Sequence, residues 1–178
     1  MTPLPESSYS PRWQAGARTD PPPIADEREM LISYLEYYRR TVELKCLGVP
    51  KERFSDRTMP PSTMTLHGLV RHLAGVEQWW FHHQFAREKV DFVWGDDAED
   101  DFDDLSGDAE EALATWRAMC ERSREIVAGS RLDDTGVRER NGEPFSLRWV
   151  LLRMITEYAR HCGHADLLRE GIDGATGE

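Results

Sequence analysis

The sequence predicts an all-α fold, a four-helix bundle with a crossover connection and an irregular N-terminal arm. Three observations support this prediction. Four segments of about 20 residues place apolar side chains at steps of three and four, which is the period of an amphipathic helix. The links between them are polar and rich in turn residues, without paired strand patterns. A chain of 178 residues can also bury one continuous core.

The chain is expected to divide into three parts. Residues 1–23 hold six of the ten prolines, which predicts an irregular arm that is ordered only where it lies against the body or a partner. Trp13 would anchor such a contact. The four-helix bundle domain is expected over residues 24–174, and residues 175–178 are expected to fray.

The first helix is expected over residues 25–46, where apolar residues recur with helical period. Asp26 can cap this helix, because Glu29 follows three residues later, as in a capping box. Gly48 and Pro50 end it, and a loop follows.

The second helix is expected over residues 62–86, with Ser62 or Thr63 as its N-cap. An acidic link over residues 87–107 follows it. This link lacks the ligand spacing of a calcium loop, so we interpret it as a solvated loop whose acids favour the start of the next helix.

The third helix is expected over residues 108–128, with Gly129 as its C-cap. Residues 130–145 are polar and could contain a short extended segment, but they do not predict a strand. The fourth helix is expected from about residue 145 to residue 170, where Gly171 closes it.

Composition disfavours several classes of function. Acids outnumber bases 33 to 22 and the formal net charge is −11, which argues against nucleic acid and anionic lipid as partners. No apolar run has the length of a membrane span, and the N-terminus lacks the apolar segment of a signal peptide. Cys46, Cys120 and Cys162 are widely spaced, which fits reduced thiols better than disulfides. We therefore expect a cytoplasmic protein that acts on a small molecule.

Helical projection selects polar residues at the buried faces of two helices. On the fourth helix, His161 lies inside the apolar arc and Glu157 at its margin, whereas His164 lies outside it. On the second helix, His72 borders the buried arc. Three more histidines of the second helix are not expected to join them, because two point away and one lies too far along the axis: His67, His82 and His83.

Two imidazoles and a carboxylate form a ligand set that leaves open positions on a metal ion, as catalytic rather than structural sites do. Glu157 and His161 are four residues apart on one helix face, close enough to share an ion. For any single histidine, a hydrogen-bonded structural role is the simpler interpretation. Arg153 could also neutralise Glu157, since it stands one helical turn earlier.

Two stretches carry a resemblance to a known superfamily. "TLHGLVRHLAGVEQWWF" and the later "LRWVLLRMITEYARHCGHADLLREGIDG" resemble the DinB/YfiT-like superfamily, and more narrowly its mini-circle-protein-like branch, a domain of unknown function. The likeness covers about residues 25–174. It implies a four-helix bundle with a divalent-metal site, built from one His of the second helix and a [His/Glu]-x3-His pair of the last.

Residue by residue, the resemblance places the metal ligands on His72, Glu157 and His161, without distinguishing Zn, Ni, Fe and Mn. In this branch a His often stands where Arg153 stands here. Arg153 is therefore expected to change the surroundings of the ligands or to block an open position. We interpret His164 as a residue that supports a ligand, or else as an alternative ligand.

The resemblance also implies an activity, because some relatives are metal-dependent enzymes that use a low-molecular-weight thiol. A metal-dependent S-transferase or detoxification enzyme is the leading hypothesis. The alternatives are a metal-dependent hydrolase and a non-enzymatic binding or stress-response bundle. Trp79, Trp80 and Tyr158 would line the pocket, unless they are plain core aromatics. Cys162 projects into the packing arc and is not expected to be a nucleophile.

A homodimer is the expected oligomeric state. The large aromatic side chains exceed what one core is expected to hold, and apolar surface left outside a core tends to mark a contact. The residues concerned are Trp79, Trp80, Trp94 and Trp149.

Overall fold

The computed structural model describes residues 18–95, 105, 107–137 and 141–176, and it confirms the all-α fold. The elements are α1 (Glu27–Cys46), η1 (Lys51–Arg53), α2 (Leu66–Glu77), η2 (Gln78–Phe85), α3 (Ala109–Ala128), β1 (Thr135–Val137), β2 (Pro144–Ser146) and α4 (Leu147–Asp173). η1 is a 3-10 turn, and η2 continues α2 as a π-helix. Trp13 lies outside the described residues.

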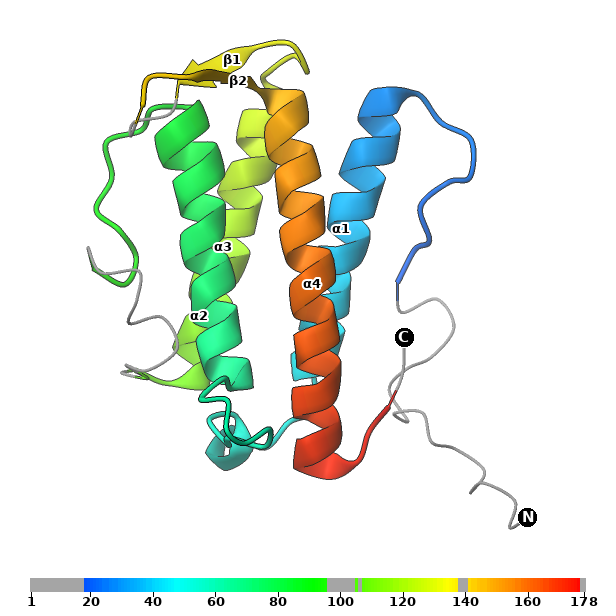
Figure 1. The fold of residues 1–178 in the computed structure, drawn as a ribbon, viewed down its shortest axis with the longest axis vertical. Helices are drawn as coiled ribbons and strands as arrows, with labels where there is room; N and C mark the ends of the chain where they lie inside the picture. Colours follow the sequence, from blue (N-terminus) through cyan, green and yellow to red (C-terminus); the bar gives the residue numbers. More distant parts are fainter. Residues whose placement is uncertain (1–17, 96–104, 106, 138–140, 177–178) are drawn as a thin grey trace.

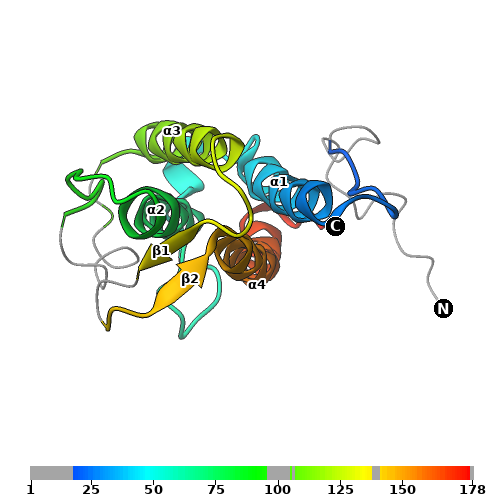
Figure 2. The ribbon, with the colours of Figure 1, turned by 90° about the horizontal axis from the view of Figure 1, so that it is seen from above.

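The four helices form two pairs. α1 packs along α4, and α2 packs along α3, while α2 and α4 face each other across the side shown in Figure 1 (Figures 1 and 2). In Figure 1, α2 and α3 run in the same direction, so the link between them has to return along the bundle. The expected crossover connection therefore lies between α2 and α3.

The core fills the space where the apolar faces of the four helices meet. Leu35 of α1, Leu69 of α2, Trp116 of α3 and Leu151 of α4 are all buried there. Burial of such side chains is the main favourable contribution to folding. In the described part of the chain, no helix is long and apolar enough to cross a membrane.

The beginning of α2 differs from the prediction. Thr65, and not Ser62 or Thr63, is the N-cap, and its hydroxyl oxygen accepts a 3.0 Å hydrogen bond from the backbone N–H of Gly68. Thr65 is fully buried and stands directly before the apolar run. The cap therefore coincides with the first buried residue, where a free N–H would be most costly. The caps predicted at Asp26 and at Gly129 are confirmed.

The end of α4 also differs from the prediction, because Gly171 does not close this helix. The helix continues to Asp173, and Gly174 caps it in the left-handed conformation, with φ of 72°. Gly171 has a different role. A Cβ at this position would lie 2.5 Å from Cβ of Thr58, so only glycine lets the loop after α1 pack this closely against α4.

A short antiparallel strand pair corrects the expectation that no strands pair between the helices. β1 and β2 pair between α3 and α4, with Gly136 opposite Phe145. A Cβ on Gly136 would lie 2.7 Å from the Phe145 ring and 2.9 Å from the carbonyl oxygen of Gln84. Glycine therefore lets this hairpin lie close against the end of η2. Three-residue strands carry too little periodicity to be recognised in the sequence.

A buried polar network joins all four helices. Arg39 of α1 forms a bidentate pair with Glu77 of α2, at 2.8 Å from Nε to Oε1 and 2.6 Å from Nη2 to Oε2. Tyr158 of α4 donates a 2.7 Å hydrogen bond to Glu77 Oε1, and its hydroxyl accepts one of 2.8 Å from Trp116 Nε1 of α3. Helical projection of the sequence did not identify this network.

The network is charged although it is buried. Burial alone would raise the pKa of Glu77, but the guanidinium of Arg39 and its hydrogen bonds hold this pKa below the ordinary value, so Glu77 is a carboxylate. Burial, together with the neighbouring charges, raises the pKa of Tyr158 well above its ordinary value, so Tyr158 keeps its proton. Hydrogen bonds on both carboxylate oxygens compensate for the loss of water.

We predict that Glu77→Gln lowers the free energy of unfolding by about 3 kcal/mol, because it removes the buried counter-charge of the Arg39 guanidinium and leaves it only the partly exposed Glu36, at 2.6 Å from Nη1. Urea denaturation followed by circular dichroism measures this loss. The double variant Arg39→Met/Glu77→Met, which removes both charges, is expected to be less destabilised than Glu77→Gln. A Glu77→Gln variant as stable as the wild type would contradict the role given to this pair.

Candidate metal centre

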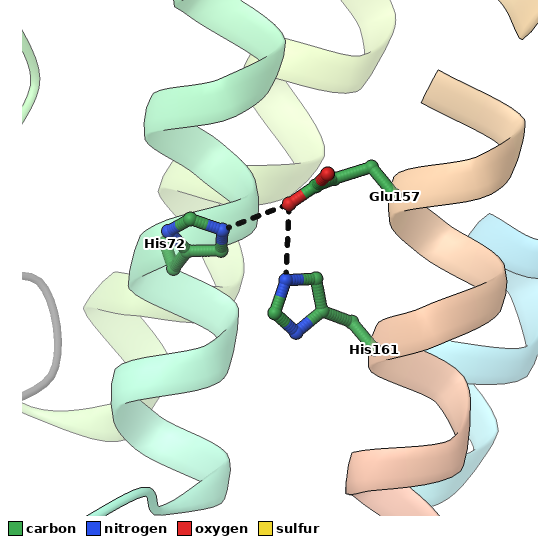
Figure 3. Close-up of side chains that lie close together, drawn as sticks. All are labelled: His72, Glu157 and His161. Carbon is green, nitrogen blue, oxygen red and sulfur yellow. Dashed lines mark hydrogen bonds and ion pairs between the residues drawn. The ribbon is translucent and has the colours of Figure 1, made fainter. Parts of the chain in front are cut away.

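Three side chains meet between α2 and α4 (Figure 3). His72 comes from α2, and Glu157 and His161 come from successive turns of α4. Oε1 of Glu157 lies 3.4 Å from Nε2 of His72 and 3.1 Å from Nε2 of His161. One ligand atom from each residue lies within 4.8 Å of the others. The structure thus brings together the triad His72, Glu157 and His161 that the sequence suggested.

The donor atoms of the triad fit a divalent transition metal. Imidazole nitrogen and carboxylate oxygen are ligands that Zn²⁺, Fe²⁺, Ni²⁺ and Mn²⁺ accept, so the set does not distinguish among these metals. Ligands at about 2.1 Å from an ion lie roughly 3.0–3.5 Å apart at adjacent corners of an octahedron or a tetrahedron. The two distances from Glu157 Oε1 agree with this spacing.

The triad is buried at its base and accessible at one edge. The side chains of Glu157 and His161 are 9% and 7% exposed, whereas those of His72 and Arg153 are 19% and 42% exposed. The accessible edge of the triad therefore lies at His72 and Arg153. Three protein ligands would leave a position for a small molecule on an ion.

The electrostatic surroundings favour the metal-binding forms of the ligands. Burial alone would raise the pKa of Glu157, but the hydrogen bond from His72 and the nearby His161 and Arg153 lower it below its ordinary value. Burial, reinforced by the neighbouring imidazole of His72, lowers the pKa of His161 to about 4. At neutral pH, Glu157 is therefore a carboxylate and His161 a neutral imidazole.

The hydrogen bonds determine which nitrogen of His161 carries the proton. A carboxylate oxygen can only accept, so Nε2 of His161, which faces Glu157, is the protonated nitrogen. Nδ1 of His161 is then an acceptor, and it lies 3.2 Å from Nδ1 of His164, which must donate. The structure therefore places His164 directly behind His161, outside the triad.

Arg153 lies beside the triad and is only loosely paired with it. Its Nη2 is 3.7 Å from Oε2 of Glu157, which is an ion pair without a hydrogen bond. Its guanidinium carbon lies 5.6 Å from the ring centre of Trp80. Neutralisation of Glu157 is therefore an incomplete account of Arg153.

The aromatic residues expected to line a pocket lie in three different places. Tyr158 is fully buried in the network with Glu77, so we do not assign it to a substrate pocket. Trp79 packs against His83 at 5.2 Å between ring centres, outside the triad. Trp80 alone of the three lies under Arg153 at the edge of the triad.

The aromatic excess behind the expected homodimer finds partners within the chain. Trp94 donates a 2.8 Å hydrogen bond to the carbonyl of Arg71 and stacks against its guanidinium. Trp149 packs against Trp80 at 5.2 Å between ring centres. Trp79 is 36% exposed. The homodimer stays a prediction, and this argument for it is weaker than the sequence indicated.

Two histidines that the projection turned outward face away from the triad but are buried, each 2% exposed. His82 Nε2 lies 3.2 Å from the carbonyl oxygen of Met119 and 3.1 Å from the hydroxyl of Ser123. His67 Nδ1 lies 3.0 Å from the hydroxyl of Ser55. The π-helical turns of η2 change the angular spacing after Glu77, so a uniform α-helical projection misplaces His82.

The cysteines are unsuited to nucleophilic catalysis. Burial raises the pKa of Cys46 and of Cys162 to about 12, and it raises the pKa of Cys120 as well. The thiolate is the reactive form, so these buried thiols are inert at neutral pH. None of these three cysteines is therefore a candidate nucleophile.

A large hollow between α1 and α3 lies away from the triad. A cavity of about 520 Å³ separates α1 from α3, and none of the triad residues lines it. Its charged walls are already paired: Arg124 with Glu36, and Arg117 with Glu43. The triad is the candidate functional site, because donor atoms there converge on one point and have an accessible edge.

Fold and site together define a class of protein. It is a DinB/YfiT-like four-helix bundle with a His/Glu/His triad between its second and last helices. The family model of mycothiol S-transferases matches residues 30–174, which include the whole triad. The chain therefore belongs to the mycothiol S-transferase family, which suggests a function of the thiol S-transferase type. The comparisons do not confirm the narrower mini-circle-protein-like branch. A search of curated proteins finds no match.

We predict that His161 titrates near pH 4 in the metal-free protein, which NMR of its imidazole protons measures. Its pKa in the unfolded chain is about 6.5, so the unfolded chain takes up this proton first. The free energy of unfolding therefore falls as the pH falls from about 6.5 toward 4.

Because other buried histidines titrate too, the test compares the wild type with His161→Gln at several pH values. The variant is expected to lose less stability over this range. A wild-type His161 that titrates near pH 6.5 would contradict the burial and pairing described.

Proposed function

We propose that this protein is a metal-dependent S-transferase of the detoxification type, which joins the thiol of mycothiol to an electrophilic small molecule. The observation that carries this proposal is the triad. Two imidazoles and one carboxylate converge at a site with an accessible edge, in a chain whose family is described by transfer of this thiol. A divalent metal ion and a low-molecular-weight thiol are thus both proposed as cofactors, and the thiol is consumed as a co-substrate.

The residues that would hold the ion are His72, Glu157 and His161, and the atoms that face one another are Nε2 of both imidazoles and Oε1 of Glu157. A divalent ion held there would lower the pKa of a bound thiol and so supply thiolate at neutral pH. The buried side of the triad, at Glu157 and His161, is shielded from water. The reactants would enter at the exposed side, at His72 and Arg153. The thiol gives up its proton to solvent, its sulfur forms the new bond to the electrophilic carbon, and the leaving group departs with the electron pair of the broken bond.

His164 supports His161 in this proposal. An ion needs the lone pair of His161 Nε2, so the ring proton has to move to Nδ1. His161 then donates the 3.2 Å hydrogen bond that it accepts from His164 in the metal-free protein. The two imidazoles can exchange donor and acceptor roles without a change of position.

Binding of Zn²⁺ to the metal-free protein, measured by competition with a chelating dye, tests the site. We expect His72→Ala, Glu157→Ala and His161→Ala to abolish stoichiometric binding while the helicity stays unchanged. His164→Ala is expected to weaken binding by about 10- to 100-fold, as removal of a ligand's hydrogen-bond partner does. His83→Ala, a histidine that packs against Trp79 in the π-helical continuation of α2, is the matched control.

Two outcomes of this titration would change the account. Equal losses in His164→Ala and His161→Ala would make His164 a ligand. Stoichiometric binding that persists in all three triad variants would exclude the triad as the metal site. A chain that binds no metal, with stability unchanged in His72→Ala, would instead favour a non-enzymatic binding module.

The reaction is tested with protein loaded separately with Zn²⁺, Ni²⁺, Fe²⁺ and Mn²⁺. We expect conjugation of mycothiol to a model electrophile such as a chlorodinitrobenzene with at least one metal, and loss of about a hundredfold or more of the rate in Glu157→Ala. Mass spectrometry of the thioether product measures it. Turnover without any thiol would favour a metal-dependent hydrolase, and no activity with any metal would refute the proposal.

A further inference from the structure

We propose that Arg153 and Trp80 form an anion subsite beside the triad, which binds a carboxylate or a similar planar anion attached to a flat apolar group. As a statement about the substrate, this rests on the proposed function, because it assigns the electrophile to the class of anionic aromatic or conjugated compounds. As a statement about binding, it depends only on the geometry of the two side chains and can be tested without catalysis.

The position of Arg153 relative to Glu157 carries the first step. Oε1 of Glu157 faces both imidazoles of the triad, whereas Oε2 faces Arg153 at 3.7 Å. The two imidazoles thus face one oxygen of the Glu157 carboxylate, and the guanidinium faces the other. A molecule that reaches the accessible edge of the triad therefore meets Arg153 next to the reacting groups.

The hydrogen-bonding capacity of Arg153 carries the second step. Within the described ranges, its guanidinium makes no hydrogen bond, and its side chain is 42% exposed. Arg148, on the same helix, donates instead to both Glu27 and Asp133. A guanidinium presents five N–H groups in a fixed planar arrangement that matches a carboxylate. Arg153 therefore has donors available for a ligand.

Trp80 carries the third step, because it supplies both orientation and an apolar surface. The guanidinium carbon of Arg153 lies 5.6 Å from the Trp80 ring centre, within the range of cation–π attraction. Trp80 is fixed in turn by edge contacts with Trp149 at 5.2 Å and Phe145 at 6.1 Å between ring centres. A cation held at the edge of an aromatic cluster is suited to a ligand with one charged end and one flat apolar end.

Charge balance completes the argument. Glu157 has one negative charge, which a divalent ion on Oε1 would largely neutralise. The guanidinium, beyond hydrogen-bonding distance of Oε2, would then lack a full counter-charge. A ligand anion supplies it. Of the two roles that the sequence left open for Arg153, pairing with Glu157 describes the metal-free protein, and participation in the site describes the loaded one.

The test is calorimetric titration of the Zn²⁺-saturated full chain with benzoate and with benzamide, which share shape but differ in charge. The wild type is expected to bind benzoate more tightly than benzamide. Arg153→Met should weaken benzoate binding by about 10- to 100-fold, the value of hydrogen bonds to a charged group, and leave benzamide unchanged. Arg153→Lys should give an intermediate loss, because an ammonium lacks the planar pair of donors.

Arg160→Met is the matched control, since Arg160 is an exposed arginine of the same helix about 10 Å away along the axis. It is expected to leave both affinities unchanged. Circular dichroism and Zn²⁺ titration verify that every variant is folded and loaded.

Three results would overturn the subsite. The first is a benzoate affinity that is unchanged in Arg153→Met, which would place the anion on the metal alone. The second is an equal loss of benzoate affinity in Arg160→Met. The third is a loss of benzamide affinity in Arg153→Met that equals the loss of benzoate affinity. The result is distinct from that of the proposed function. If benzoate binding depends on Arg153 but no thiol is transferred, the transferase is refuted and the subsite stands. If thiol is transferred but benzoate binding does not depend on Arg153, the subsite is refuted and the transferase stands.

Discussion

The buried pair between Arg39 and Glu77 is the interaction on which the rest of the structure depends. It joins the α1/α4 pair to the α2/α3 pair, and Tyr158 extends it into α4. The triad needs the same constraint, because His72 lies on α2 while Glu157 and His161 lie on α4. Tyr158 is the neighbour of Glu157 in the chain, so the network holds the turn of α4 that carries the ligands. Polar groups buried in this way specify one arrangement of helices more sharply than apolar packing does.

The network and the triad use carboxylates for opposite purposes. Glu77 is surrounded by donors on both oxygens and has no exposure, so it can only be structural. Glu157 has two imidazoles on one oxygen and a distant guanidinium on the other, with an edge open to solvent. Its hydrogen-bonding capacity is therefore incompletely used. This incomplete use agrees with the proposal that Glu157 binds a metal ion.

Helical periodicity predicted the elements and the triad, but it did not predict the interactions between elements. The N-cap at Asp26 and the inward positions of His72 and His161 follow from local sequence, and each agrees with the structure. Other features depend on side chains of other elements. These are the burial of Glu77, the close approach of Thr58 to Gly171, and the position of Tyr158 in the buried network instead of at the triad. A projection of one helix identifies which face is buried. It carries no information about which residue of another helix meets that face.

The central claim is that His72, Glu157 and His161 hold one metal ion within an otherwise unchanged bundle. A crystal structure of the Zn²⁺-loaded protein, with anomalous diffraction recorded at the zinc edge, tests it most directly. The account predicts one anomalous peak at about 2.0–2.2 Å from Nε2 of both imidazoles and from a Glu157 oxygen, with protein ligands at three positions only. A peak ligated by other residues, or a fourth protein ligand that closes the site, would contradict it.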